Sequence, residues 1–373
     1  MDPQLVFCPN PACPASAQTG EGNIGIHSLK ERRYRCHLCG KTFSERQGTT
    51  MYRLRTDTQT VTIVVTLLGC GCPLQAIVVA FGLDERTVAK WQARAGAHCQ
   101  QVHEHLVEQP RDLGAVQADE IWVKLQKLKA WMAMAMQVST RLWLGGVVSP
   151  HRDRALIRAL VSKIRGCALP RPLLISVDGL ETYVKAIRLI LREHTPGRAQ
   201  KGKSCWQPWA GLCITQVVKS YAKRRLLEVQ HRIVQGMPEA VAGLIALSQG
   251  EGGINTAFIE RLNATWRSRL HHLVRRGRGL ARQVLTLEHD MYLLGTVYNF
   301  CTYHASLRTA RPADGTNRKW DQRTPAMAAG LTDHCWSVLE LLTWRVPPPR
   351  WRPPSRRGRW SKTTHALVKR WCK

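Results

Sequence analysis

The chain has 373 residues and carries 55 Lys and Arg against 26 Asp and Glu, which gives a formal net charge of +29 at pH 7. This surplus predicts a polyanionic partner, foremost a nucleic acid, although a merely basic protein of the ribosomal kind would have a similar charge. No apolar run reaches the roughly 18 to 20 residues of a membrane span and no signal peptide is evident, so we expect a cytoplasmic, nucleoid-associated protein with no membrane partner.

Two pairs of cysteines stand within the first fifty residues. Four residues separate the members of the first pair, two separate those of the second, and 22 lie between the pairs. Two such pairs can supply four thiolates to a structural, tetrahedral Zn²⁺, so residues 1–50 are predicted to form a small zinc-binding ribbon. His27 or His37 could replace one thiolate, but free surface histidines are the simpler interpretation. The predicted ligands are Cys8, Cys13, Cys36 and Cys39.

Residues 51–111 are predicted to form an all-α helix-turn-helix region and a linker. An apolar helix ends at Gly82, and Asp84 is a good cap for a second helix that begins ERTVAKWQARAG. Helix, glycine-containing turn and basic helix are typical of a DNA-binding module, although an ordinary helical hairpin has the same pattern. The side chains predicted to contact DNA are Arg86, Thr87, Lys90 and Arg94.

From residue 112 the pattern changes to strands. Three β-compatible runs, VQADEIWVKL, KAWMAMAMQVS and RLWLGGVVS, precede an amphipathic helix, the buried-type strand LLISVDG, another helix, two further strand candidates and a basic helix. This order predicts an α/β, ribonuclease H-like catalytic domain over residues 112–305. Residues 306–373 are expected to be a basic, mostly irregular and partly flexible segment. It could lie along a DNA backbone or be a solvated tail without a specific role.

Three acidic residues of this domain have the setting of metal ligands. Asp119 follows an apolar run, and Asp178 closes another at the carboxyl end of its strand, where open α/β sheets bind ligands. Glu260 opens the basic helix, whose polar stripe also carries Asn263 and Arg267, both predicted to contact DNA. Two strand-borne aspartates and a helix-borne glutamate can hold a pair of Mg²⁺ or Mn²⁺ ions for phosphoryl transfer. The simpler interpretation of Asp178 is a cap of the following helix.

Glu120, the neighbour of Asp119, is a competing ligand. The strand period of two puts Gln117, Asp119 and Ile121 on one face and Glu120 on the other, so Asp119 and Glu120 are predicted not to face one site. Either carboxylate alone could be a surface charge, and the spacing does not choose between them. We take Asp119 as the predicted ligand.

These motifs resemble those of DDE-type insertion-sequence transposases that begin with a zinc finger and a helix-turn-helix. The resemblance rests on QADEIW around Asp119, SVDG around Asp178, and FIERLNATWRSRLHHLVRRGRGLAR around Glu260, followed by YNFCTYH. It covers nearly the whole chain, and the stretch around Glu260 is its most specific part. It implies a ribonuclease H fold, two-metal cleavage and strand transfer of DNA, and a homo-oligomer that joins transposon ends to target DNA. The 82 residues from Asp178 to Glu260 exceed the compact spacing of several such families and leave the insert 195–249 without a role.

Two other functions fit the same motifs. A DNA-binding regulator derived from a transposase would keep the zinc and helix-turn-helix modules without catalysis. A nuclease of the same fold would cleave DNA without joining it. The presence of all three carboxylates favours an enzyme over a regulator.

Overall fold

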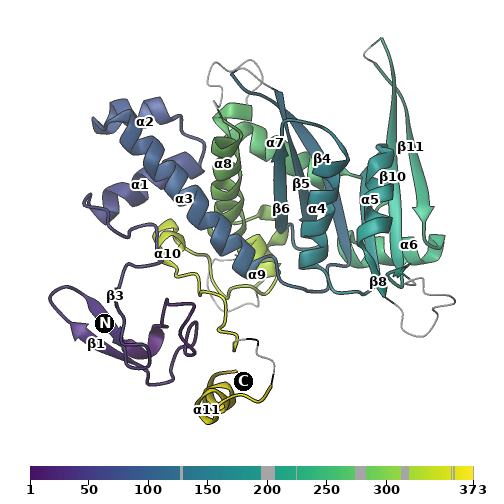
Figure 1. The fold of residues 1–373 in the computed structure, drawn as a ribbon. Helices are drawn as coiled ribbons and strands as arrows, with labels where there is room; N and C mark the ends of the chain where they lie inside the picture. Colours follow the sequence, from purple (N-terminus) through teal and green to yellow (C-terminus); the bar gives the residue numbers. More distant parts are fainter. Residues whose placement is uncertain are drawn as a thin grey trace. The chain divides into compact units, whose positions relative to one another are not determined.

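The computed structural model describes residues 1–126, 129–194, 206–223, 225–273, 283–311, 319–353, 355 and 358–372 (Figure 1). The chain divides into two compact units, one formed by Met1–Thr58 with Leu342–Lys373 and the other by Gln59–Leu341. Both ends of the chain therefore belong to the smaller unit. Within the described ranges, no helix combines the length and the apolar character that crossing a bilayer requires.

The smaller unit is built on a three-stranded antiparallel sheet in the order β1-β2-β3. Its core contains Tyr34 and Phe43, whose rings stack with centroids 5.7 Å apart, together with the cysteines of the first fifty residues. This composition matches a small ribbon whose few apolar side chains pack around a cysteine cluster. The N-terminal elements are the 3-10 helix η1 (Pro3–Leu5) and the strands β1 (Ile24–Ser28), β2 (Arg33–Cys36) and β3 (Thr42–Ser44).

The end of the chain completes this core. Helix α11 (Lys362–Trp371) begins after Ser361, whose hydroxyl accepts a hydrogen bond from the Thr364 N–H, and packs Leu367 and Trp371 into the cysteine-containing core. The Gln18 side-chain amide donates to the Trp371 carbonyl at 2.8 Å. The expectation of a mostly irregular C-terminal segment is wrong for this stretch, because two apolar side chains one helical turn apart give α11 a face to bury.

The larger unit begins with three helices, α1 (Thr58–Gly69), α2 (Leu74–Phe81) and α3 (Glu85–Leu106). Helix α2 ends at Gly82, which has the left-handed φ of 61° that glycine adopts without strain. Asp84 then caps α3 by accepting a hydrogen bond from the Thr87 N–H at 2.9 Å. The two predicted helices and their turn are present, and α3 continues beyond the expected basic helix to lie along α8 (Figure 1).

The centre of this unit is a mixed six-stranded sheet in the order β11-β10-β7-β4-β5-β6. The first three strands in sequence form an antiparallel meander, β7 pairs parallel with β4, β10 pairs parallel with β7, and β11 returns antiparallel along β10. Both strand candidates that follow Asp178 therefore belong to the sheet. The strands are β4 (Ala115–Lys124), β5 (Lys129–Gln137), β6 (Trp143–Ser149), β7 (Leu173–Asp178), β10 (Leu212–Ala222) and β11 (Arg225–Gln235).

Helices cover both faces of the sheet. Helices α4 and α5 pack together on one side, where α4 contacts β5 and β6; α6 packs on β4 and β7, and α7 on β4 and β5. Gln117 of β4 points to α7, since its side-chain oxygen accepts from the Phe258 and Ile259 N–H groups at 3.0 Å. The covering helices are α4 (Arg154–Cys167), α5 (Glu181–Ile190), α6 (Pro238–Gln249), α7 (Ala257–Arg269) and α8 (Val284–Thr296).

The long separation between Asp178 and Glu260 is largely accounted for by β10, β11 and α6; residues 195–205 and 224 of the insert lie outside the described residues. Residues 274–282 of the stretch around Glu260 also lie outside them. The remaining elements are β8 (Arg192–His194), β9 (Trp206–Pro208), η2 (His271–Leu273), the π-helix η3 (Val297–Cys301), η4 (Ala305–Leu307), β12 (Thr309–Ala310), β13 (Trp320–Asp321), α9 (Pro325–Ala328) and α10 (Val338–Thr343).

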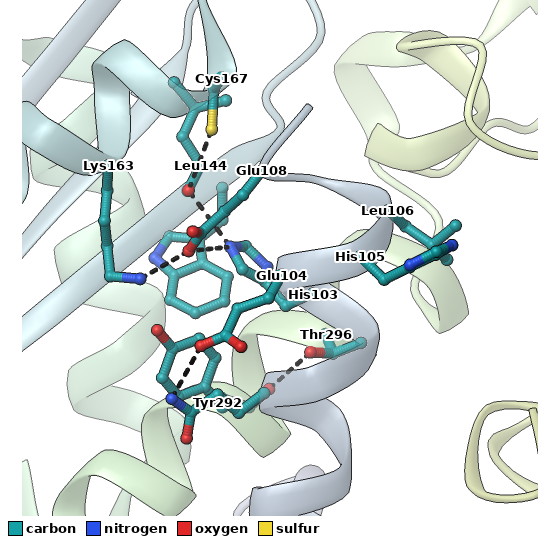
Figure 2. A network of polar contacts seen from close by, with 12 residues as sticks. His103, Glu104, His105, Leu106, Glu108, Leu144, Lys163, Cys167, Tyr292 and Thr296 are labelled. Carbon is teal, nitrogen blue, oxygen red and sulfur yellow. Dashed lines mark hydrogen bonds and ion pairs between the residues drawn. The ribbon is translucent and has the colours of Figure 1, made fainter. Parts of the chain in front are cut away.

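A buried polar network fixes the end of α3 against the sheet. The Nε2 atom of His103 lies 3.2 Å from the Leu144 carbonyl of β6. Figure 2 shows this contact beside the ion pair of Lys163 and Glu108. Burial, to which Lys163 adds, lowers the pKa of His103 to about 3, so the imidazole is neutral at physiological pH. Strand β6 approaches the ring through Gly145, whose φ of 128° favours glycine and where an added Cβ atom would meet His103 Nε2 at a tight 3.2 Å. The network ties the helical region to the sheet as one body.

Candidate metal and nucleic-acid sites

The four cysteines predicted to bind zinc converge in the smaller unit. The Sγ atoms of Cys8 and Cys39 are 3.7 Å apart, those of Cys13 and Cys36 are 3.9 Å apart, and all four lie within 4.8 Å of one another. Four sulfur atoms at about 2.3 Å from a central ion would be separated by about 3.8 Å in a tetrahedron. The cluster could therefore hold Zn²⁺ with four protein ligands, which leaves no open position for a substrate.

The thiols of this cluster differ in their proton affinity. Burial raises the pKa of Cys8, and it raises the pKa of Cys13 to about 12. Burial also acts on Cys39, but hydrogen bonds from the Lys41 backbone N–H and the Asn10 side chain outweigh it and lower its pKa to about 7. Buried thiols that resist ionisation on their own fit a cation site, because a bound metal ion displaces their protons.

A second cluster, which we call the acidic cluster, joins Asp119, Glu120 and Asp178 in the larger unit. One carboxylate oxygen from each residue lies within 4.8 Å of the other two. Strand β4 pairs with β7 through Gln117 and Ser176, and continuing this parallel register brings Asp119 level with Asp178, the last residue of β7. The two predicted aspartates thus meet at the carboxyl end of β7, beside the middle of β4, which continues to Lys124. The carboxyl end of a parallel strand is where an open α/β sheet is expected to bind a ligand.

The prediction that Asp119 and Glu120 cannot face one site is wrong. Their side chains do leave β4 in different directions, since Asp119 accepts from the Asn263 amide of α7 at 2.8 Å and Glu120 pairs with Arg152 at 3.0 Å. One oxygen of each carboxylate nevertheless lies within 4.8 Å of the other and of Asp178. The Oδ1 atom of Asp119 also accepts a hydrogen bond from the Glu120 N–H at 2.8 Å, which turns this carboxylate towards the next residue of the strand.

Electrostatics in the acidic cluster favour a bound cation. Burial raises the pKa of Asp119 to about 7, and the nearby carboxylates, including that of Glu260, add to the effect. Burial and Asp178 likewise raise the pKa of Glu120, while Arg152 opposes them. The Arg152 guanidinium bridges Glu120 and Asp178 at 3.0 and 3.4 Å. Carboxylates that burial and neighbouring negative charge keep from ionising, as at Asp119 and Glu120, suit a hard divalent cation, so the cluster could hold Mg²⁺ or Mn²⁺.

Glu260 is near the acidic cluster without belonging to it. Its Oε1 accepts hydrogen bonds from Lys219 at 2.5 Å and from the Thr256 hydroxyl at 2.9 Å, and its side chain is 46% exposed. Its charge nevertheless contributes to the raised pKa of Asp119, which places it within electrostatic reach. Sequence reasoning missed Lys219. This residue follows Val217, which pairs with Asp178, by two positions along β10, and its closeness to Glu260 becomes apparent only once the sheet order is known.

The residues predicted to contact DNA differ in their exposure. On α3, Arg86 and Lys90 are exposed, whereas Thr87 and Arg94 are half-buried. Asn263 is 1% exposed and its side-chain amide donates to Asp119, so in this structure it orients a carboxylate. Arg267, one turn further along α7, is half-buried.

The two clusters offer different chemistry. Four thiolates around one ion give a closed, structural site, whereas the acidic cluster adjoins the exposed carboxylate of Glu260 and can leave ligand positions for a substrate. No protein-family model and no curated protein matches the chain. The functional argument therefore depends on the geometry and charge of these sites.

Proposed function

We propose that the protein is a DNA strand-transfer enzyme, a DDE transposase of an insertion sequence, in which Asp119, Asp178 and Glu260 hold divalent metal ions. The observation that carries the proposal is the meeting of Asp119, in the middle of β4, with Asp178 at the end of the adjacent parallel strand β7, with the charge of Glu260 acting on Asp119 from α7. The net charge of +29 makes a nucleic-acid phosphodiester the natural substrate.

The order of elements supports a ribonuclease H-like domain. An antiparallel meander, β4-β5-β6, is followed by α4, the parallel strand β7, α5 and the parallel strand β10. Strand β11 and helix α6 then form the insertion that precedes α7, the helix of Glu260. In this fold the acidic residues of two central strands and one covering helix form the catalytic centre.

The residues of the site have separate roles in this proposal. Bound Mg²⁺ or Mn²⁺ supplies Lewis-acid stabilisation of the transferring phosphoryl group and a water of lowered pKa. Asn263 and the Glu120 N–H hold the carboxylate of Asp119 in one orientation. Lys219 neutralises Glu260 and lies where its ammonium can bind a phosphate oxygen. Cleavage and joining are both in-line displacements, so positioning and charge neutralisation suffice for catalysis.

The other parts of the chain serve DNA binding. Exposed Arg86 and Lys90 at the start of α3, with Thr87 and Arg94, recognise the element's ends. The cysteine cluster binds Zn²⁺ as a structural ion. The active form is a homo-oligomer that holds two ends and the target DNA together in the nucleoid.

The test is strand transfer of a labelled DNA end into a plasmid. The DNA that flanks the gene supplies the candidate ends. Asp178→Asn and Glu260→Gln should abolish cleavage and joining while leaving DNA binding intact, because binding depends on the basic surface. Glu181→Gln, which removes an exposed carboxylate of α5, is the matched control and should retain activity.

Three outcomes separate the alternatives. Wild-type protein that cleaves without joining is a nuclease, and wild-type protein that binds the ends without cleaving is a regulator. Full strand transfer by every carboxylate variant would refute the two-metal site. Glu120→Gln should reduce activity as well, since its carboxylate belongs to the acidic cluster.

A further inference from the structure

A basic hollow lies beside α7, away from the acidic cluster. This pocket of about 260 Å³ is enclosed by the end of β5, the β5–β6 turn, α7 and the segment from η3 to η4. No Asp or Glu stands among the described residues that line it. Its charged and hydroxyl-bearing side chains include Arg141, Arg261, Thr265, Arg269, Tyr298 and Thr302.

Helix geometry separates this pocket from the acidic cluster. Arg261, Thr265 and Arg269 follow one another at intervals of four residues and so form one stripe along α7. At about 100° per residue, that stripe is centred roughly half a turn away from the one that carries Glu260 and Asn263. Glu260 and Asn263 contact Lys219 and Asp119, whereas the arginine stripe faces the β5–β6 turn. The helix therefore presents carboxylate chemistry on one side and concentrated positive charge on the other.

The positive charge of the pocket is not balanced from within it. The Arg141 guanidinium lies over the Phe258 ring at 3.8 Å, and burial, to which Arg261 adds, lowers its pKa. Burial also lowers the pKa of His304, with Arg141 and Arg261 adding to the effect, so this imidazole does not supply a further fixed cation. Guanidinium groups gathered at a concave surface without a carboxylate form a site for an external anion.

The backbone at Arg141 is consistent with a functional demand. Its φ of 59° is left-handed, a conformation that glycine or asparagine adopts with less strain in a turn. Tyr298 donates a hydrogen bond to the Arg141 carbonyl at 3.2 Å and helps to hold the turn. The Arg141 guanidinium lines the pocket over Phe258, and one of its nitrogens, Nη1, donates a hydrogen bond to the Val138 carbonyl.

We propose that this pocket binds a phosphate group of the DNA backbone and anchors the duplex on the side of α7 opposite the acidic cluster. The planar guanidinium fork pairs with two phosphate oxygens at once. The hydroxyls of Thr265 and Thr302 already donate to the Arg261 and Val297 carbonyls, so the arginines carry the recognition of the anion. Arg141, Arg261 and Arg269 are positioning residues, because they lie away from the reacting atoms. The choice of DNA as the source of the phosphate rests on the proposed function; free inorganic phosphate shares the chemistry.

The experiment measures equilibrium binding of a duplex of arbitrary sequence to full-length protein at several salt concentrations, without divalent metal. The double variant Arg261→Gln, Arg269→Gln should bind about 10-fold more weakly. The slope of log K against log salt should fall by about 0.9 for each phosphate that the variant no longer neutralises. The double variant Arg154→Gln, Arg158→Gln makes the same charge change on exposed positions of α4 and should have a much smaller effect.

Three further measurements decide the outcome. Thermal unfolding of the Arg261→Gln, Arg269→Gln variant should match the wild type, since Arg261 is exposed and Arg269 half-buried.

Calorimetric titration with inorganic phosphate, repeated with chloride at equal ionic strength, separates the two ligand sources. If the variant no longer binds phosphate but still binds DNA as the wild type does, the assignment to DNA is overturned. If the variant binds both phosphate and DNA as the wild type does, the pocket is not an anion site. Asp178→Asn protein should bind the duplex as the wild type does, so failure of the catalytic proposal leaves this result interpretable.

Discussion

The protonation of Asp119 should make the free energy of unfolding depend on pH. Burial, with the neighbouring carboxylates adding to it, raises the pKa of Asp119 from 3.8 to about 7. The folded protein then holds this proton more tightly than the unfolded chain does. Stability therefore falls as the pH rises from about 4 to about 7 and stays low at higher pH. At about 1.4 kcal/mol for each tenfold change in proton affinity, the loss amounts to roughly 4 kcal/mol in metal-free protein.

Asp119→Asn removes the titrating group, while its amide oxygen can still accept the hydrogen bond from Asn263. Above pH 7 we expect the metal-free variant to be more stable than the wild type by about 2 to 4 kcal/mol, whereas near pH 4 the two should be equal. Urea unfolding followed by circular dichroism, with a chelator present, measures this difference. Added Mg²⁺ should raise the wild-type midpoint above pH 7 more than that of the variant, because the ion stabilises the ionised cluster.

The control is Glu181→Gln, which removes a carboxylate whose side chain is 77% exposed on α5 and should leave the pH dependence unchanged. A variant at Asp119 that is less stable than the wild type at every pH would refute the reasoning. In that case the carboxylate would contribute more through its hydrogen bonds to Asn263 and the backbone than it costs through burial and repulsion.

Three further results are expected. Wild-type protein should carry about one Zn²⁺ per chain by metal analysis, and full zinc in a Cys36→Ser, Cys39→Ser variant would contradict the assignment. Replacing Arg86 and Lys90 with Ala should weaken binding to the element's ends and lower the salt slope by about one for each phosphate that is no longer neutralised; unchanged binding across salt concentrations would move recognition elsewhere. Trp371→Ala should destabilise the smaller unit by about 3 to 5 kcal/mol, measured by urea unfolding and by zinc retention during dialysis, since it empties part of the core; equal zinc retention and stability would show that α11 is dispensable.

Local signals made several elements predictable from the sequence. Gly82 and Asp84 act through the backbone within a few residues of their own position, so they mark the turn and the start of α3 without knowledge of the rest. The apolar runs before Asp119 and Asp178 likewise predicted two buried strands that carry these carboxylates, one within β4 and one at the end of β7. Cysteine spacing predicted the convergence of four thiols for the same reason, because each pair lies on one short turn.

Features set by long-range pairing could not be predicted in this way. The strand period gives the direction in which the Glu120 side chain leaves β4. It does not give the distance between the carboxylates of Glu120, Asp119 and Asp178, which depends on how β7 pairs with β4. The helical periodicity gives the direction in which Asn263 leaves α7, but not how deeply its side chain is buried, so its hydrogen bond to Asp119 was missed. The hydrogen bond of Lys219 with Glu260 depends on the register of β10 on β7. Strand β10 lies in the insert, and the sequence does not indicate how the insert pairs with the sheet.

Helix α7 explains why arginines crowd beside one carboxylate in the sequence. Adjacent residues on a helix differ by about 100°, so Arg261 and Glu260 are neighbours in sequence and point to different surroundings. A bound phosphate behind the helix would balance the guanidinium groups, and a divalent cation in front of it would balance the carboxylates. Under the proposed function, DNA supplies the phosphate and its metal ions supply the cation, so that each face of the helix would meet a ligand of opposite charge. Lys219, which already pairs with Glu260, shows that the carboxylate side attracts a cation.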